Sequence, residues 1–401
     1  MKRSVVSVAV LAAVGLAVTA CSSSGSSGSS GGSGSGSPIT IALPVPLTSG
    51  NSTAAQQMVD TAKLAVADIN KNGGAGGHQL ALKTYDDQGT ADGATQVVQR
   101  ALTVDGAKVI IGAYSTAESI AVRTVAEREK VVYIGSSAVG PQVTQDAKYT
   151  FRTTINQADY APPMARVIKN LSLSKPAILA DTGPVGSTLP PGIASELKSE
   201  GITALSPVSY TINSTDVSSS VSKVVAQHPD SVIIVSSSSA DQGLLVKTLD
   251  EQGLHVPIVG FGSLTAANGL KIGGNSYSKM PGVYAVQNFD PTKTTFTNFV
   301  KEFAAATGGD ATSLNTTINE QCPDTYDAFQ ALKLALDADH GDTSGDALAA
   351  ALHKITYSDP VAGKTGAAVS FQDSQDGFHD SLAVFKLGSG NVLAPAPELN
   401  K

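Results

Sequence analysis

The chain has 401 residues, with 27 lysine and arginine residues, 34 aspartate and glutamate residues and a formal net charge of −7 at pH 7. An acidic balance without a basic cluster argues against nucleic acid as a partner. The length exceeds what one hydrophobic core usually organises, so we expect two lobes.

The N-terminus carries an export signal. Lys2 and Arg3 precede an apolar run over residues 5–18, and Ala20 stands directly before Cys21. The run is too short to cross roughly 30 Å of hydrocarbon as a helix, so residues 1–20 are predicted to be a cleaved signal peptide. Small residues before a cysteine resemble a bacterial lipobox, which implies that Cys21 is lipidated and anchors the chain to a membrane. The alternative is a plain secreted protein in which Cys21 is incidental.

The segment after Cys21 is a linker. Residues 22–37 contain only serine and glycine, which cannot bury a core and should form a flexible coil. Residues 21–37 are therefore predicted to be a lipid anchor followed by a spacer. With Cys21 lipidated, Cys322 has no partner for an intrachain disulfide, so packing must stabilise the fold.

From Pro38 onward, short apolar runs alternate with stretches of helical periodicity. The first set predicts strands at 39–43, 80–85, 109–111 and 131–134, with helices at 53–70, 92–104 and 118–128. A second set begins with a helix at Pro162-Pro163 and predicts strands at 177–180, 232–235 and 257–260, with helices at 193–200, 217–227 and 244–252. Strand and helix alternating at this spacing predict an α/β fold with two doubly wound parallel-sheet lobes.

Small polar residues follow four of these strands. In open parallel sheets, ligands bind beyond the carboxyl ends of the strands. Hydroxyl groups both donate and accept hydrogen bonds, and a loop that opens a helix offers free N–H groups to an anion. Any single loop of this kind is more often an ordinary turn, but four at equivalent strand ends predict one binding site. Its candidate residues are Tyr114, Ser115, Thr116, Ser136, Ser137, Ala138, Val139, Ser238, Ser239, Phe261 and Gly262.

The order of these segments resembles a known family. Residues 110–116, Ile-Ile-Gly-Ala-Tyr-Ser-Thr, are similar to the Gly-x-x-Ser-Ser ligand loop of type I solute-binding proteins. Residues 39–50, the Phe151-Arg152-Thr153 crossover and Tyr326-Asp327-Ala328 follow in the family's order. The resemblance covers about residues 38–388 and is nearest to the branched-chain amino acid and amide-binding components of ABC importers.

The resemblance implies a two-lobed clamshell that closes on its solute. Three hinge crossings would lie near residues 153–155, 285–287 and 368–370. The first lobe would then comprise residues 38–154 plus 286–368, and the second lobe residues 155–285 plus 369–401. The solute would bridge the two lobes.

The resemblance also assigns roles to individual residues. In amino acid binders, the positions of Thr116 with Ser115, and of Ser137 with Ala138, hold the ligand carboxylate and share its ammonium group. The hydroxyl residue usually found next is Val139 here, and the tyrosine expected before Gly186 is Val185.

The acid that would neutralise an ammonium group is expected near Gly262, where the sequence has none. Burying an unpaired ammonium is costly. An α-amino acid therefore requires Asp181, Asp241 or another acid as a substitute, whereas an anion, an amide or a polar neutral metabolite fits at least as well.

The function implied is that of an extracytoplasmic substrate-binding lipoprotein. It would capture an amino acid, amide or carboxylate at the periplasmic or outer face of the cell membrane and deliver it to an ABC permease and its ATPase. We expect a monomer without metal or cofactor. The alternative is a ligand-sensing module of the same fold that acts with a membrane receptor. An enzyme would need a nucleophile–base pair or a metal cluster, and the sequence shows neither; Asp86-Asp87 reads as a turn and helix cap.

Overall fold

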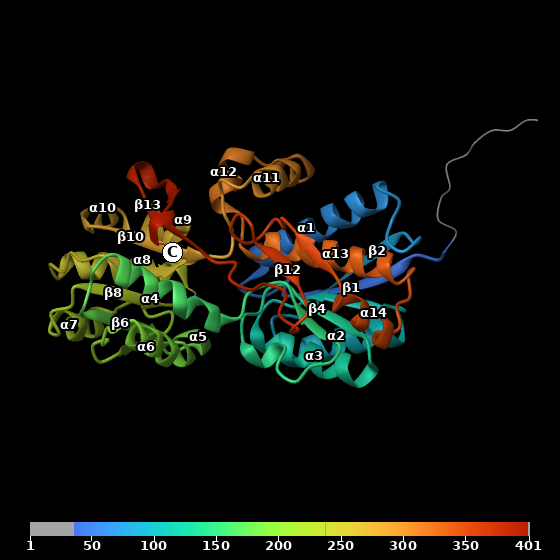
Figure 1. Ribbon diagram of the computed structural model, residues 1–401, viewed down its shortest axis with the longest axis horizontal. Coiled ribbons are helices and arrows are strands. Elements are labelled where there is room, and N and C mark those ends of the chain that lie inside the picture. The colour runs from blue at the N-terminus through green and yellow to red at the C-terminus, as the bar shows by residue number, and fades with distance from the viewer. Residues whose placement is uncertain (1–35, 237, 400–401) are drawn as a thin grey trace, which may run out of the picture. The chain divides into compact units, whose positions relative to one another are not determined.

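Two parallel sheets form the framework of the protein. The computed structural model (Figure 1) describes residues 36–236 and 238–399. The first sheet has the order β2-β1-β3-β4-β5, and all its neighbouring strands are parallel. Its strands are β1 (Ile39–Val45), β2 (Leu80–Asp86), β3 (Val109–Gly112), β4 (Val132–Gly135) and β5 (Thr150–Arg152).

Helices cover both faces of the first sheet. Successive side chains of a strand point to opposite faces, so Ile41 packs with Met58 and Phe329, whereas Ala42 packs with Val98 and Val122. One face is covered by α1 (Ser52–Lys71) and α13 (Gln321–Ala338), and the other by α2 (Ala91–Thr103) and α3 (Thr116–Glu129).

The second sheet has the order β14-β13-β10-β9-β8-β6-β7. Its parallel part, β7-β6-β8-β9-β10, repeats the order of the first sheet, and β13 and β14 add antiparallel to one edge. Its strands are β6 (Pro176–Asp181), β7 (Val208–Tyr210), β8 (Ser231–Val235), β9 (Ile258–Phe261), β10 (Val283–Gln287), β13 (Ala383–Leu387) and β14 (Leu393–Pro395).

The helices around the second sheet divide in the same way. Ile178 and Ile233 share a core with α4 and α6, while Leu179 and Ile234 share another with α7 and α8. These helices are α4 (Ala161–Asn170), α6 (Pro190–Ser199), α7 (Ser218–Val225) and α8 (Ser239–Glu251).

The remaining elements are shorter or peripheral. The helices are α5 (Pro184–Thr188), α9 (Ala267–Gly273), α10 (Ser276–Lys279), α11 (Thr294–Thr307), α12 (Ala311–Thr317) and α14 (Gly345–Leu352). The 3-10 turns are η1 (Pro141–Val143), η2 (Gln157–Tyr160), η3 (Gly262–Thr265), η4 (Ser389–Asn391) and η5 (Pro397–Leu399). A separate two-stranded sheet pairs β11 (Thr356–Ser358) with β12 (Ala368–Ser370).

The predicted fold class is confirmed. Every strand and helix expected from periodicity is present within a few residues, and the two α/β sets form two parallel sheets. Strands β5, β7 and β10 to β14 were not predicted. The first of these, β5, has only three residues, Thr150–Arg152, which is too short for a periodic pattern.

A polar cluster around Asp324 of α13 joins the connections between the sheets. Thr153, after β5, donates its hydroxyl to the Asp324 carbonyl oxygen at 2.9 Å. Asn288, after β10, donates from Nδ2 to Asp324 Oδ1 at 3.1 Å, and Ser381, before β13, donates to Asn288 Oδ1 at 2.6 Å. Burial raises the pKa of the Asp324 carboxyl well above its ordinary value.

The structure places the predicted crossings as follows. Residues 153–155 follow β5 directly, and 285–287 are the end of β10. Ala368–Ser370 is β12, paired with β11, and the chain enters the larger sheet only at Ala383. The residue ranges assigned to the two lobes remain a prediction.

The N-terminal predictions fall outside this description. The signal peptide, Cys21 and the Ser/Gly segment up to residue 35 precede the described residues. Within the described part, no helix combines the length and apolarity that a membrane span needs. Cys322 is a fully buried free thiol.

Candidate functional site

In the loop between β3 and α3, the backbone N–H groups are hydrogen-bonded to the side chain of Glu118, from the first turn of α3. Ser115 is the N-cap of α3, and its hydroxyl accepts the Glu118 N–H at 3.3 Å. The Glu118 carboxylate in turn accepts the N–H groups of Tyr114 and Ser115 at 3.0 and 2.7 Å. The N–H groups at the start of α3, which we expected to be available to an anion, are therefore partly occupied by Glu118 in a capping box.

Residues of the β3 and β4 loops hold each other in place. Ser137 donates its hydroxyl to the Tyr114 carbonyl oxygen at 2.8 Å, and the Ser136 hydroxyl lies 2.9 Å from that of Thr325 on α13. Thr116 lies so close to Gly140 that a Cβ on this glycine would meet the Thr116 methyl at 2.4 Å. The β3 and β4 loops are thus tied to each other and to α13.

Behind the β4 loop lies a fully buried arginine. The Arg152 guanidinium donates to the Gly140 carbonyl oxygen at 2.8 Å and to that of Ala138 at 3.4 Å. Its Nη2 forms an ion pair with Asp376 Oδ1 at 2.7 Å. Val139 is half-buried against the core, and its carbonyl oxygen accepts the Gln157 N–H at 2.8 Å. These contacts fix the backbone of the loop that carries Ser137 to Val139.

The clearest meeting of the two sheets is at Gly262. A Cβ at this position would stand 3.1 Å from Gln287 Oε1 and 3.8 Å from Glu320 Oε2. Gly262 follows β9, Gln287 ends β10, and Glu320 is the N-cap residue of α13. The Gln287 Cβ is also 3.1 Å from this position, so only the absence of a side chain at Gly262 allows two acceptor oxygens from different elements to approach it this closely.

Aromatic rings lie around the same point. The rings of Tyr160 and Phe261 meet edge to face, with centroids 4.4 Å apart. The pKa of the Tyr160 hydroxyl is raised mainly by burial and secondly by the charge of the nearby Glu320 carboxylate. The pKa of Tyr114 is raised by the same two causes in the same order. Tyr114, Tyr160, Phe261, Gly262, Gln287 and Glu320 are hereafter called the Gly262 group.

The Gly262 group has acceptors in excess. Gln287 is fully buried, and its Nε2 donates to the Phe289 carbonyl oxygen at 3.1 Å, which leaves Oε1 without a partner. Glu320 is half-buried and forms no hydrogen bond or ion pair with the described residues. Burial raises the pKa of its carboxyl. The arrangement can receive a hydrogen-bond donor, above all a charged one.

Other predicted positions have local roles. Ser238 caps α8, where its hydroxyl donates to Asp241 Oδ1 at 3.0 Å. Ser239 lies in the first turn of α8, and its carbonyl oxygen is 2.7 Å from where a Gly269 Cβ would lie. Val185 is partly buried against the main core. Among the contacts described, these three residues do not join the Gly262 group.

Both acids suggested as substitutes accept hydrogen bonds from backbone N–H groups, although Asp181 Oδ2 is buried without a partner among the described residues. Asp241 Oδ2 accepts the Asn213 N–H at 2.9 Å, and Asp181 Oδ1 accepts the Gly183 N–H at 2.8 Å. The sequence has no acid beside Gly262, and the other acid that could substitute is Glu320, whose Oε2 lies 3.8 Å from the Gly262 Cβ position. The sequence carried no signal for this residue, because only the packing of α13 brings it to the end of β9.

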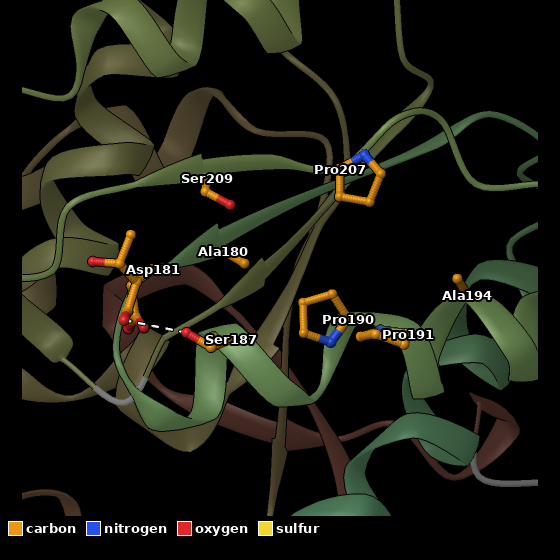
Figure 2. Close-up of a pocket in the computed structure, with 10 residues that line it drawn as sticks. Ala180, Asp181, Ser187, Pro190, Pro191, Ala194, Pro207 and Ser209 are labelled. Atoms are coloured by element: carbon orange, nitrogen blue, oxygen red, sulfur yellow. Dashed lines mark hydrogen bonds between the residues drawn. The ribbon is translucent and has the colours of Figure 1, made fainter.

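A separate cavity of about 300 Å³ lies at the β6–β7 edge (Figure 2). Ala180 and Asp181 line it together with Pro190, Pro191 and Pro207, and Ser187 donates its hydroxyl to the Thr182 carbonyl oxygen at 3.2 Å. Of the positions considered from the sequence, only Asp181, one of the two suggested substitute acids, lines this cavity. Asp181 is the only ionisable residue that lines the cavity, and its Oδ1 serves the turn before α5.

Comparison with known proteins places the chain in a family. The family model described as "Periplasmic binding protein" matches residues 38–389. Leu/Ile/Val-binding protein homolog 3 of Brucella melitensis is 26% identical, over 88% of this chain and 93% of that protein.

Solved structures share the fold. A substrate-binding protein of an ABC transporter from Desulfitobacterium hafniense, in complex with Leu, superposes with a TM-score of 0.73 at 20% identity, over 90% of this chain and 100% of that one. A solute-binding protein of an ABC transporter from R. palustris, in complex with 4-hydroxybenzoate, gives a TM-score of 0.74 at 16% identity, over 90% and 95%. This chain belongs to the periplasmic binding protein family and has its type I fold.

Proposed function

We propose that this protein captures one small polar solute at the Gly262 group and delivers it to an ABC permease. The observation that carries the proposal is the convergence of three elements, the ends of β9 and β10 and the start of α13, on one point with unpartnered acceptors. The family match and the ligand-bound proteins of the same fold support it. Closure of the lobes on the solute would then select one conformation by contacts made only there.

The protein acts by binding, without chemical conversion. Serine is the residue in these loops that could serve as a nucleophile, and both serines of the β4 loop are otherwise engaged: Ser136 with the Thr325 hydroxyl and Ser137 with the Tyr114 carbonyl oxygen. We expect a bound solute to be recovered unchanged after incubation, as judged by mass spectrometry. A stoichiometric change in its mass would contradict this part of the proposal.

The direct test is a thermal-shift screen of the purified protein against amino acids, amines, amides, carboxylates and aromatic acids. A solute at about 100 times its dissociation constant stabilises the folded state by roughly 2.7 kcal/mol. Titration calorimetry should then give one site per chain. If no small polar solute shifts the melting temperature, the proposed function is wrong.

The membrane anchor is proposed on the Ala20-Cys21 pattern. Lipidated Cys21 would hold the protein outside the cytoplasm within reach of its permease. In cells given labelled palmitate, the wild-type protein should incorporate label and sediment with membranes. Cys21→Ser should remove both properties, and unchanged sedimentation of that variant would contradict the anchor.

A further inference from the structure

The Tyr114 peptide of the Gly262 group is held from both sides. Its N–H donates to Glu118 Oε2 at 3.0 Å, and its carbonyl oxygen accepts the Ser137 hydroxyl at 2.8 Å. Ala113, directly before it, has a φ of 56°, a left-handed conformation that is unfavourable for a residue with a Cβ. The loop therefore depends on these contacts to keep Tyr114 in place.

Glu118 makes its contact as a buried acid at the start of α3. Only 2% of the residue is exposed, and the same Oε2 also accepts the Ser115 N–H at 2.7 Å. Within the part of the chain that the structure describes, no cation forms an ion pair with it. Two N–H donors at a helix N-terminus stabilise a negative charge, so Glu118 serves the loop as a carboxylate.

A second acid, Asp87, lies behind the same loop at the end of β2 and is fully buried. Its Oδ1 accepts the Gly89 N–H at 2.9 Å, whereas its Oδ2 has no partner among the described residues. Burial raises the pKa of Asp87 to about 7, and the negative charges of Glu118 and Asp86 add to the rise. Two buried acids within reach of each other are more stable with one negative charge than with two.

The described groups around the two acids add negative charge or are engaged elsewhere. Asp86, next to Asp87 in the chain, is a third acid. Burial, followed by the charges of the two acids, raises the pKa of Tyr133 on β4, whose hydroxyl donates to the Gly112 carbonyl oxygen at 3.1 Å. The charge of Arg152 lowers the same pKa, but Arg152 is paired with Asp376. A proton on Asp87 is therefore the means by which the pair avoids two adjacent buried charges.

We propose that Glu118 is a positioning residue of the solute site, and that the proton on Asp87 controls how firmly Glu118 holds Tyr114. With Asp87 protonated, Glu118 carries the one charge behind the loop and keeps both N–H bonds. Loss of the proton places a second charge nearby, and repulsion loosens the Glu118 side chain. This inference rests on the proposed function, because it takes Tyr114 to be part of the solute site. It makes that site more ordered below neutral pH than above it.

Hydrogen exchange of the solute-free protein measures this contact directly. Mass spectrometry with fragmentation follows the Tyr114 and Ser115 amides at pH 6 and pH 8.5, and each rate is divided by the intrinsic rate at that pH. The variants are Glu118→Gln and Asp87→Asn. Glu127→Gln is the matched control, because Glu127 lies on the same helix and accepts the N–H groups of residues 148 and 149.

In the wild-type protein, protection of the two amides should fall roughly 3- to 10-fold between pH 6 and pH 8.5. Asp87→Asn should keep the protection seen at pH 6 at both pH values. Glu118→Gln should lower protection roughly 10-fold at both, because a charged acceptor is replaced by a neutral one. Glu127→Gln should leave these two amides as in the wild-type protein even where it lowers the melting temperature.

Calorimetry then connects the contact to binding. The solutes are L-leucine and 4-hydroxybenzoate, which occupy solved proteins of this fold, together with any other that the thermal-shift screen identifies. A solute that binds should bind more weakly at pH 8.5 than at pH 6 in the wild-type protein. Asp87→Asn should reduce this difference, which corrects for ionisation of the solute itself. Glu118→Gln should weaken binding at both pH values, and Glu127→Gln should not.

The outcomes separate this inference from the proposed function. Unchanged amide protection in Glu118→Gln, or a wild-type pH dependence in Asp87→Asn, overturns the inference while the proposed function stands. Equal loss of protection in Glu127→Gln does the same, because Glu118 would then contribute only to general stability. A bound solute whose affinity is indifferent to Glu118→Gln also overturns the positioning role. If no solute of any class binds, the proposed function is wrong and the positioning role with it, whatever the exchange rates show.

Discussion

The ion pair between Arg152 and Asp376 should contribute strongly to the stability of the first sheet, which carries the β3 and β4 loops. Arg152 is fully buried in β5, and Asp376 lies in the segment that returns toward β13. Their atoms Nη2 and Oδ1 are 2.7 Å apart, and Nε lies 3.0 Å from the same oxygen. Removing one partner of a buried pair leaves the other uncompensated, which costs about 3–5 kcal/mol.

Arg152→Met preserves most of the side-chain volume but removes the charge. Asp376 would keep the Thr144 hydroxyl at 2.8 Å and the Asn156 amide at 3.3 Å, so we place the loss of unfolding free energy near 3 kcal/mol. Asp376→Asn should cost more, because the arginine is the more deeply buried partner. The double variant should be less destabilised than the two single variants added together, with a coupling of about 2 kcal/mol.

Urea unfolding at pH 7 measures these changes. The chain has no tryptophan, so far-UV circular dichroism and tyrosine fluorescence are the two probes, and their transitions must coincide for a single free energy to be valid. Lys63→Met, at an exposed ion pair with Asp60, is the control and should change the free energy by less than about 1 kcal/mol. A coupling energy near zero in the double-mutant cycle would refute the reasoning.

The pH dependence gives a second view of the pair. Burial alone would raise the pKa of Asp376, but the Arg152 charge and the hydrogen bonds to it lower the pKa below 3.8. A carboxyl with a lowered pKa in the folded state contributes stability above its unfolded pKa and loses it as the pH falls through the folded value. The wild-type protein should therefore lose stability below about pH 3.8, and Arg152→Met should lose less there.

Three further predictions follow from single sites. Asp87 is fully buried, and burial raises its pKa to about 7, so the native state keeps a proton that the unfolded chain releases. The free energy of unfolding should therefore fall by up to roughly 4 kcal/mol between pH 4 and 7. Urea titrations at several pH values should show that Asp87→Asn lacks this part of the decline. The same decline in Asp87→Asn as in the wild-type protein would contradict the prediction. Cys322 is buried and its pKa is raised to about 12, so a thiol reagent should label it only in urea, and rapid labelling of the native protein would disprove its burial. Two helical glycines form a matched pair, because a Cβ at Gly243 would meet the Gly269 carbonyl oxygen at 2.3 Å whereas one at Gly192 has its nearest neighbour at 3.8 Å. Gly243→Ala should lower the free energy of unfolding by about 1–3 kcal/mol, and Gly192→Ala should raise it by about 0.5–1 kcal/mol, with the melting temperature moving in the same direction. Equal shifts would show that the α8–α9 contact is looser than described.

Much of the fold could be predicted from local patterns. The buried strands β1, β3, β4, β6 and β8 are continuous apolar runs because helices cover both faces of each sheet. Repeated strand–helix spacing then predicts parallel sheets. The rule about carboxyl ends makes Ser137 and Gly262 candidate site residues, which stays a prediction. The capping box was not predicted, although Ser115 and Glu118 have the spacing that the motif requires.

Other features depend on tertiary packing. Glu320 precedes a helix whose sequence pattern marks only its core side, through residues such as Phe329. Which strand end this helix start approaches is decided by how α13 packs on α1, and a single sequence does not encode that contact locally. The same holds for Asp376, which meets Arg152 across a long stretch of chain. Side-chain chemistry at such meeting points becomes visible only in three dimensions.

The cluster around Asp324 has a mechanical consequence. Asn288 gives a hydrogen bond to Asp324 and receives one from Ser381, while Thr153 is bonded to the Asp324 backbone. A rotation in any one of these three connections therefore displaces the other two, because all three are hydrogen-bonded around Asp324. We expect a swing of the lobes to be one concerted rotation between two well-separated conformations instead of a continuum.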